Sequence, residues 1–266
     1  MSVTSQVPET CASAISATRP WCEKANTAVG YRPTQSATTS ATYNRGMRLA
    51  KEMERRLERL VDGATAAVFR GKMHPVDMAE RLMRQADFLA YEGPAGLQIP
   101  NRWTMRINPL DIPEDVDRAQ LGNELAAALA ETAQDRAWRL NGPISVGILA
   151  DAAVPRGLAD CAGQSEPGPL PAWGQLVAVA PPIALNVADN RNTLGRSLDS
   201  DVVANLPEVS RHQAMIVRRG AEVTISDAQS ANGTFVNGEP IDATPHVLVP
   251  GDTVTVGDVD FTFRLL

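Results

Sequence analysis

In the first half of the chain, apolar residues recur every three to four positions along three stretches, at residues 47–70, 75–91 and 113–140. This spacing places the apolar side chains on one face of a helix, and charged residues occupy the other faces. Apolar and polar residues alternate over residues 97–108, and a short apolar run covers residues 144–149. Both patterns are typical of strands. The order ααβαβ predicts a small two-layer α+β domain with helices packed on a short sheet.

The last third of the chain has a different pattern, in which short apolar runs are separated at close intervals by residues that favour turns. The runs are residues 176–180, 185–188, 215–217, 223–225, 234–236, 247–249, 254–256 and 261–265. This pattern predicts an all-β sandwich, whose loops gather at the ends of a rigid scaffold. The predicted fold class is therefore multidomain, with an α+β domain followed by a β-sandwich.

Two further segments have no persistent period. Residues 1–46 are rich in Ser, Thr and Ala and are predicted to form a disordered tail. Met47 directly precedes the first predicted helix, so translation starting there would omit this tail. Residues 151–175 are rich in Ala, Pro and Gly, which predicts a flexible linker. The two predicted domains are then residues 47–150 and 176–266.

Length and composition exclude several classes of protein. With 266 residues, of which 44% are hydrophobic, the chain suits two modest domains. No stretch approaches the roughly 20 apolar residues of a membrane span, and the N-terminus lacks the basic-then-apolar order of a secretory signal. The three scattered cysteines, Cys11, Cys22 and Cys161, indicate neither a disulfide framework nor a zinc site. We expect a cytoplasmic protein without a metal or cofactor.

Charge is distributed unevenly along the chain. Residues 175–266 hold six arginines and eleven aspartates and glutamates, a net charge of −5. An acidic domain is a poor binder of nucleic acid, and the arginines of the first helix are interleaved with glutamates. Against this background Arg196 and Arg211, both in predicted loops, mark a local positive site.

Three polar blocks in the predicted sandwich contain the candidate chemistry. They are Gly195-Arg196-Ser197, Val209-Ser210-Arg211-His212-Gln213-Ala214 and Ser230-Ala231-Asn232-Gly233-Thr234-Phe235-Val236-Asn237-Gly238. Arginine offers a planar fork of donors, and serine hydroxyls and loop N–H groups add single hydrogen bonds. No Ser/His/Asp or Cys/His set accompanies them. This set is suited to binding a phosphate group without transferring it.

The order and spacing of these blocks, with the closing run Leu248 to Gly257, resemble the forkhead-associated (FHA) domain over about residues 176–266. The resemblance implies a β-sandwich that binds phosphothreonine peptides. It assigns the phosphate to Arg196 and Ser210, and the peptide to Asn232 and Arg211. Supporting positions in the loops are Gly195, Gln213, Ala231, Gly233 and Asn237. Asn237, with Gly238, is expected to shape a turn.

Two residues depart from the pattern of that family. Gln213 stands where the family places a histidine that braces the site, and glutamine also donates hydrogen bonds. Ala231 stands where many members have threonine or another polar residue, so one side-chain contact to phosphate is missing.

The first domain resembles the N-terminal domain of FhaA-type proteins of actinobacteria. The resemblance rests on Met53 to Val61, on Pro100-Asn101-Arg102-Trp103-Thr104-Met105-Arg106-Ile107 and on Gly142-Pro143-Ile144-Ser145-Val146. It implies a signalling adaptor that acts downstream of Ser/Thr kinases, with those kinases or their substrates as partners. In that family the adaptors are linked to control of the cell envelope.

Three interpretations of function remain open from the sequence. The first is a phosphothreonine-dependent adaptor, and the second is a degenerate module that binds proteins independently of phosphate, as Gln213 and Ala231 suggest. The third is an enzyme, for which the sequence offers no nucleophile set, Walker loop or metal-ligand spacing. In a variant of the first, a phosphorylated threonine of the tail docks on the chain's own site. The candidate threonines are Thr34, Thr38 and Thr39.

Overall fold

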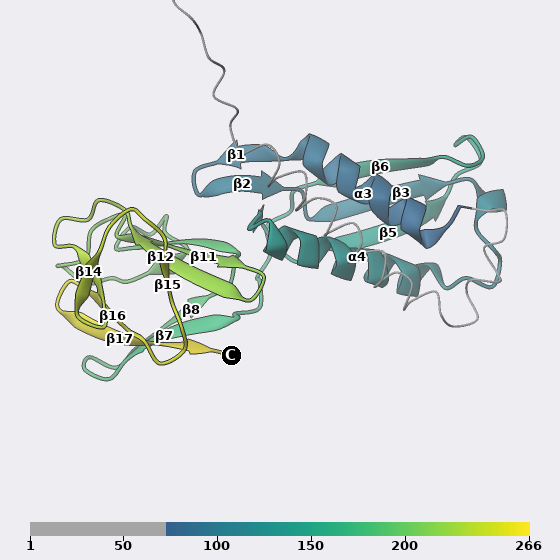
Figure 1. Cartoon of the computed structure of the whole chain (residues 1–266). Helices are drawn as coiled ribbons and strands as arrows, with labels where there is room; N and C mark the ends of the chain where they lie inside the picture. Colours follow the sequence, from purple (N-terminus) through teal and green to yellow (C-terminus); the bar gives the residue numbers. More distant parts are fainter. Residues whose placement is uncertain (1–72) are drawn as a thin grey trace, which may run out of the picture. The chain divides into compact units, whose positions relative to one another are not determined.

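The computed structural model describes residues 73–266 (Figure 1). The predicted tail, its three candidate threonines and the predicted helix at residues 47–70 lie outside the described residues. Within residues 73–266, no helix has the length and apolar character needed to cross a membrane.

The N-terminal domain has two layers, with helices α3 (Pro75–Leu89) and α4 (Arg118–Asp135) beside a three-stranded sheet, as Figure 1 shows. The sheet has the order β5–β3–β6, in which the central strand runs parallel to β5 and antiparallel to β6. Its strands are β3 (Arg102–Ile107), β5 (Ser145–Ala150) and β6 (Ala159–Gln164). A second small sheet, of order β1–β2–β4, consists of β1 (Tyr91–Gly93), β2 (Gly96–Ile99) and β4 (Arg139–Leu140).

The alternation along β3 determines which face of the sheet is covered. Trp103, Met105 and Ile107 are buried against the helices, whereas Arg102 and Arg106 are exposed on the opposite face. Period-two alternation therefore predicted the orientation of this strand correctly.

Three details of the N-terminal domain differ from the sequence prediction. The stretch 97–108 forms two strands in different sheets, because the chain turns at Pro100-Asn101. The helix expected from residue 113 starts at Arg118, where Asp117 caps it by accepting hydrogen bonds from two backbone N–H groups. A short 3₁₀ helix, Pro109–Asp111, precedes it. The described part thus contains more strands than the predicted order ααβαβ.

The segment predicted to be a flexible linker contains strand β6, so that interpretation is wrong for residues 159–164. β6 pairs with β3 along its full length and buries Ala159 and Cys161 under the helices. Its side chains are mostly small or polar, and the sequence therefore shows no strand pattern there. Burial raises the pKa of the Cys161 thiol to about 11, so this cysteine stays protonated at neutral pH.

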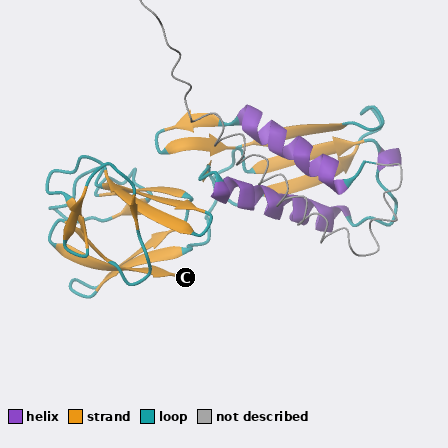
Figure 2. Ribbon diagram, viewed as in Figure 1, coloured by secondary structure: helices purple, strands orange, loops and turns teal. Residues whose placement is uncertain are grey.

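The C-terminal domain is a sandwich of two sheets, which confirms the predicted all-β fold (Figure 2). One sheet has the order β10–β9–β11–β12–β15, and the other has the order β14–β13–β16–β17–β7–β8. The strands are β7 (Gly174–Ala178), β8 (Ile183–Val187), β9 (Arg191–Gly195), β10 (Val202–Val203), β11 (Ala214–Arg219), β12 (Glu222–Asp227), β13 (Thr234–Val236), β14 (Glu239–Ile241), β15 (His246–Val247), β16 (Thr253–Val256) and β17 (Val259–Leu265). Apolar side chains from both sheets, among them Leu194, Ile216, Phe261 and Phe263, are fully buried between them.

Strands β9, β10 and β14 were not predicted, and β9 matters most because it leads into Arg196. Its sequence is polar, yet Asn192 is only 1% exposed. The Asn192 side chain accepts a hydrogen bond from the backbone N–H of Asp189 and donates one to the Asp189 carbonyl, which closes the turn before the strand. An asparagine satisfied in this way can lie in the interior at little cost.

Candidate functional site

Three loops that the sequence analysis singled out meet at one end of the C-terminal sandwich. The backbone N–H of Arg196 donates to the carbonyl of Ser210 over 2.9 Å, and that of Ser197 donates to the carbonyl of Arg211 over 3.3 Å. The third loop joins them where the N–H of Ala231 donates to the Ser210 hydroxyl oxygen over 2.9 Å. Ser210 therefore contacts both of the other loops.

Gly195 permits the close approach of the first two loops. A Cβ atom at this position would lie 2.1 Å from the carbonyl oxygen of Arg211, a distance that no side chain tolerates. Gly233, in the third loop, has a φ of 80°, a backbone conformation that favours glycine.

Arg196 and Arg211 are exposed at this end of the sandwich, and neither guanidinium forms a hydrogen bond or an ion pair within residues 73–266. The two aspartates that follow Arg196 in the same loop, Asp199 and Asp201, have other partners. Asp199 accepts a long hydrogen bond of 3.5 Å from the Ser197 hydroxyl, and Asp201 is bound by an arginine of the N-terminal domain. Both guanidinium forks are therefore free to bind an external anion.

The Ser210 and Asn232 side chains also keep unused hydrogen-bonding groups. The Ser210 hydroxyl accepts the N–H of Ala231, which leaves its own hydrogen available for donation. The Asn232 amide donates one hydrogen bond, to the Glu208 carbonyl over 2.9 Å, and so ties the third loop to the second. Its amide oxygen has no partner among the residues that the structure describes and can accept a hydrogen bond from a bound peptide.

Gln213 braces the site from within the domain, with a fully buried side chain. Its amide nitrogen donates to the Gly233 carbonyl over 2.9 Å and to the Thr234 hydroxyl over 3.0 Å. Its amide oxygen accepts the backbone N–H of Ser210 over 2.9 Å. One side chain thus connects the second loop with the third, and glutamine supplies the bracing contacts that the family resemblance assigned to histidine.

Ala231 and Asn237 contribute less than the other predicted residues. The Ala231 side chain is an exposed methyl group, and only its backbone N–H joins the cluster. Asn237 and Gly238 have φ values of 52° and 84° and form the two-residue turn between β13 and β14. The Asn237 side chain bonds to Asp252 and Thr253, at the opposite end of β13 from Gly233, so it stabilises that turn and does not face the three loops.

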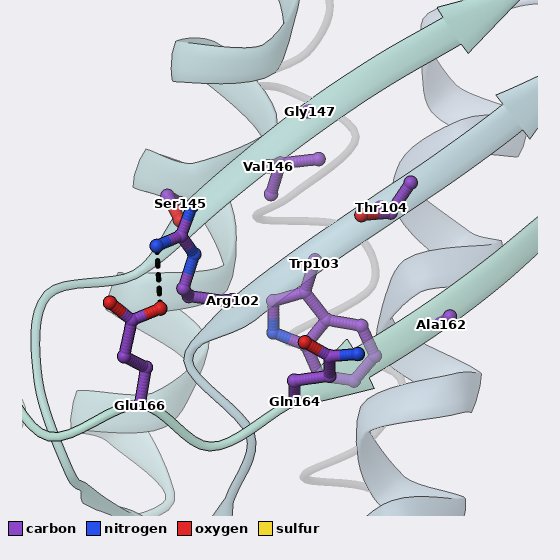
Figure 3. Close-up of a pocket in the computed structure, with 9 residues that line it drawn as sticks. All are labelled: Arg102, Trp103, Thr104, Ser145, Val146, Gly147, Ala162, Gln164 and Glu166. Atoms are coloured by element: carbon purple, nitrogen blue, oxygen red, sulfur yellow. Dashed lines mark hydrogen bonds and ion pairs between the residues drawn. The ribbon is translucent and has the colours of Figure 1, made fainter.

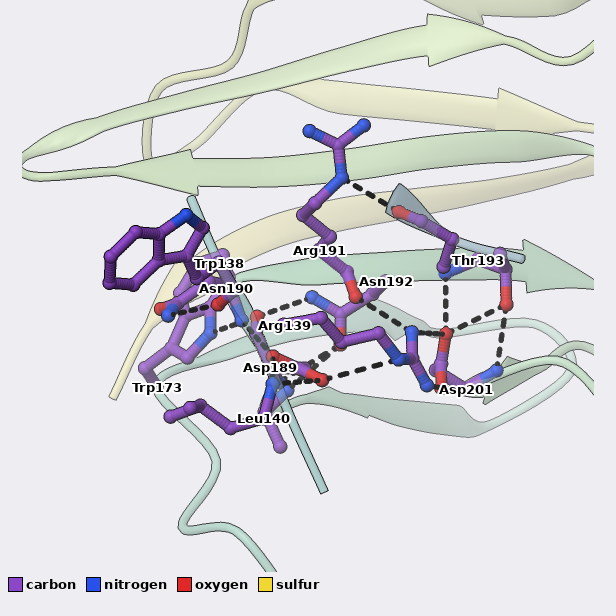
Figure 4. A network of polar contacts seen from close by, with 12 residues as sticks. Trp138, Arg139, Leu140, Trp173, Asp189, Asn190, Arg191, Asn192, Thr193 and Asp201 are labelled. Carbon is purple, nitrogen blue, oxygen red and sulfur yellow. Dashed lines mark hydrogen bonds and ion pairs between the residues drawn. The ribbon is translucent and has the colours of Figure 1, made fainter. Parts of the chain in front are cut away.

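The sequence analysis missed a polar network that joins the N-terminal domain to the start of the candidate site (Figure 4). Arg139, in β4, makes a two-pronged ion pair with Asp201, with one N–O distance of 2.8 Å. Asp201 also accepts the backbone N–H and the hydroxyl of Thr193, each over 2.8 Å. Burial would raise the pKa of Asp201, but these hydrogen bonds outweigh it and hold the pKa below its ordinary value. No local sequence signal relates residues 139 and 201.

Asp189 lies in the same network with a side chain that is almost completely buried. Its carboxylate accepts the backbone N–H groups of Leu140 and Asn190, and Arg139 approaches it to 3.6 Å. Burial nevertheless dominates and raises the pKa of Asp189 from 3.8 to about 6.

This pKa predicts how the stability of the protein depends on pH. Because the folded state binds the Asp189 proton more tightly than the unfolded chain, stability from this group is present at about pH 4 and is lost as pH rises towards 6. In Asp189→Asn this dependence disappears, so the stability of the wild type relative to the variant should fall by about 2 kcal/mol between pH 4 and pH 7. Denaturant unfolding at several pH values measures the difference.

The control is Asp201→Asn. The stability of the wild type relative to this variant should rise with pH, because the pKa of Asp201 is lowered in the folded state. A difference between wild type and Asp189→Asn that stays constant from pH 4 to pH 7 would contradict the assigned pKa.

A separate hollow of about 560 Å³ lies on the open face of the β5–β3–β6 sheet (Figure 3). The small residues Thr104, Gly147 and Ala162 form its floor in one cross-strand row, and an Arg102–Glu166 ion pair lies at one end. Its lining contains no cysteine or histidine, and the described residues contain no group of three metal-ligating side chains.

Comparison with protein families confirms both resemblances. Residues 50–161 match the family described as FhaA, N-terminal domain, and residues 192–257 match the family described as FHA domain. The first match includes the start of β6, in agreement with the pairing of that strand.

Similar proteins come from mycobacteria. The ABC transporter ATP-binding/permease protein Rv1747 of Mycobacterium tuberculosis is 41% identical over 92 residues, which cover 34% of this chain and 9% of that protein. The transcriptional regulatory protein EmbR of M. tuberculosis is 30% identical over 180 residues, or 68% of this chain and 37% of EmbR. The chain thus spans well under half the length of either relative.

Among solved structures, M. tuberculosis EmbR in complex with a low-affinity phosphopeptide shares 33% identity with a TM-score of 0.33. The match covers 35% of this chain and 24% of that one.

Proposed function

Since residues 192–257 form an FHA domain behind an FhaA-type N-terminal domain, we propose that this chain is a non-catalytic signalling adaptor that binds phosphothreonine peptides. Its partners are proteins modified by Ser/Thr kinases, or the kinases themselves. The observation that carries the proposal is the meeting of three loops that hold two exposed, unpaired arginines and the Ser210 hydroxyl, whose hydrogen is free.

The proposed binding mode follows from the donors that remain free at the site. Arg196 places its planar fork against two phosphate oxygens, and the Ser210 hydroxyl donates to a third. Arg211 lies beside the residues that follow the phosphothreonine, and the Asn232 amide holds the peptide backbone. These groups form only hydrogen bonds with the phosphate dianion and the peptide amide, and no covalent bond is made or broken. No general base contacts the Ser210 hydroxyl to activate it among residues 73–266, so on this proposal the site binds the phosphate without hydrolysing it.

The charge of the domain limits the range of ligands. Residues 175–266 carry a net charge of −5, and Asp199 and Glu208 lie in the loops of the site. A peptide with acidic residues beside the phosphothreonine is therefore repelled, while the phosphate itself is attracted locally by the two arginines. We propose that the domain selects single phosphates in neutral or basic peptides, in the cytoplasm.

The finer role follows from the FhaA-type domain, and we propose regulation of the cell envelope as the process that this adaptor serves. A second candidate is a protein-interaction module that does not require phosphate. The observation that favours it is the methyl group of Ala231, which gives a bound phosphate no side-chain hydrogen bond.

Matched peptides distinguish the two candidates. We expect the full chain to bind a phosphothreonine peptide with an affinity that weakens as salt increases, because the phosphate is solvent-exposed, and to bind the unmodified threonine peptide at least tenfold more weakly. A phosphoserine peptide should lie between them, since it lacks one buried methyl worth about 0.8 kcal/mol. Isothermal titration calorimetry at two salt concentrations measures all three affinities.

Equal affinity for the phosphorylated and unmodified peptides would support the phosphate-independent module instead. A screen of a phosphopeptide library against the full chain would then supply the sequence preference for either candidate.

A further inference from the structure

Arg139 is the one residue outside the FHA domain that, among the described residues, binds the carboxylate at the end of the 196–201 loop. This loop connects β9 to β10, two strands that lie side by side in parallel, and it begins with Arg196. Arg139 and Asp201 each keep only 20% of their side-chain surface exposed, so the ion pair is largely shielded from water. Shielding strengthens the attraction relative to a surface pair.

The Asp201 carboxylate closes the loop onto strand β9. It accepts both the backbone N–H and the hydroxyl of Thr193, while the N–H of Asp201 donates back to that hydroxyl over 3.1 Å. Arg139 donates to both oxygens of the Asp201 carboxylate, and it also donates to the carbonyl of Arg191 over 3.1 Å. The Arg139 guanidinium therefore binds strand β9 directly, at the Arg191 carbonyl, and binds the end of the 196–201 loop at Asp201.

The ion pair also determines which carboxylates remain free near Arg196. Asp201 is ionised at neutral pH, and it follows Arg196 by five residues in the same loop. Without Arg139 its carboxylate would be free to pair with another cation, and Arg196 is an unpaired arginine of that loop. Such an internal pair would compete directly with a phosphate for the guanidinium of Arg196.

Further contacts hold the N-terminal domain in this position. The Asn190 amide donates to the Trp138 carbonyl over 2.9 Å, and the Gln134 amide donates to the Gly220 carbonyl over 2.7 Å. The Arg191 guanidinium donates to the Ala95 carbonyl over 2.7 Å. Arg139 is therefore held against the FHA domain by neighbours on three different segments of its own domain.

We propose that Arg139 is a positioning residue of the phosphopeptide site, which holds Asp201 so that the 196–201 loop stays closed on β9 and Arg196 stays unpaired. The proposal rests on the proposed function for its effect on binding, whereas its effect on the loop is independent of any ligand. It makes the FhaA-type domain part of the binding machinery, because release of that domain removes Arg139 and weakens the site.

Two measurements on the full chain test this proposal. In Arg139→Ala, hydrogen–deuterium exchange should be faster at the amides of residues 193–201, since the Asp201 carboxylate that accepts the Thr193 N–H is no longer held by the guanidinium. The affinity for a phosphothreonine peptide should fall about tenfold, within the range typical of coupling between two sites. Arg139→Lys, which keeps the charge but not the two-pronged geometry, should recover part of the affinity.

Arg102→Ala is the matched control, because it breaks an exposed ion pair with Glu166 on the open sheet face of the same domain and should change neither measurement. In an Asp201→Asn background, the change Arg139→Ala should have little further effect on affinity, since the carboxylate through which it acts is gone.

Unchanged exchange in a folded Arg139→Ala or Arg139→Lys protein would overturn the proposal, as would an equal loss of affinity in both Asp201 backgrounds. If the wild type binds no phosphopeptide, the proposed function is wrong, and the exchange measurement still decides whether Arg139 orders the loop. If Arg139→Ala does not fold, the comparison of Arg139→Lys with wild type gives the same decision.

Discussion

Replacing Arg196 with alanine is expected to remove measurable binding of a phosphothreonine peptide and to leave the fold unchanged. The guanidinium is exposed and has no partner among residues 73–266, so its loss should change the free energy of unfolding by less than about 0.5 kcal/mol. In the complex the same group forms a charge-assisted fork to a dianion, and truncating such a partner costs roughly 2–5 kcal/mol. At about 1.4 kcal/mol per decade, affinity falls at least thirtyfold.

The control for this prediction is Arg219→Ala, which removes an arginine of the same charge. Arg219 is the last residue of β11, whereas the candidate site lies at the start of that strand, next to Gln213. It should alter affinity only through net charge, by less than about threefold at physiological salt. Fluorescence anisotropy with a labelled phosphopeptide measures both variants. If Arg196→Ala binds as tightly as wild type while Arg211→Ala does not, the phosphate belongs to Arg211 and our assignment of the two arginines is reversed.

The second large effect is expected for Gln213→Glu, a change that keeps the shape of the side chain. The carboxylate can still accept the N–H of Ser210, but it cannot donate to the Gly233 carbonyl and the Thr234 hydroxyl. The position is fully buried, so the variant either buries an unpaired charge or takes up a proton at a cost. We expect the free energy of unfolding to fall by about 3 kcal/mol at pH 7 and to recover partly as pH falls.

Gln175→Glu is the matched control, since Gln175 is on the surface of β7 and its amide bonds to Asn186, whose own amide can rotate to donate instead. Thermal and denaturant unfolding at pH 5 and pH 7 compare the two variants. A stability loss in Gln213→Glu no larger than that in Gln175→Glu would show that Gln213 does not brace the loops.

The bracing role explains why a departure from the family pattern need not abolish the site. Asp227 stabilises the same loop as Gln213. Its carboxylate accepts hydrogen bonds from Ser230 and from Thr234, the residue whose hydroxyl also contacts Gln213. Burial would raise the pKa of Asp227, but these hydrogen bonds hold it below its ordinary value. A glutamine brace has no charge to gain or lose near neutral pH, whereas a histidine would titrate there.

Much of the fold could be predicted from local patterns. Alternation along residues 102–107 determined the buried face of β3, and the turn residues between apolar runs predicted a sandwich. The spacing of Gly195, Arg196, Ser210 and Asn232 placed loops from different strands at one end of that sandwich, where the structure brings the loops together. These features depend on which residues are neighbours in the sequence or occupy one face of one element.

Other features were beyond sequence reasoning because they depend on contacts between distant residues. β9 and β6 are strands although their side chains are polar or small, since the backbone partners that pair with them come from elsewhere in the chain. No local sequence pattern distinguishes Arg139 from the other arginines. Its role depends on its ion pair with Asp201, which lies 62 positions further along the chain.

The sequence by itself determined the two fold classes, the loops that carry the site and the residue types able to hold a phosphate. Tertiary structure decided which of those side chains remain free and which are engaged. An arginine binds whichever anion lies nearest, and the nearest carboxylate is known only once the chain is folded. For this protein Asp201 is bound by Arg139, and Arg196 is left without a partner among residues 73–266.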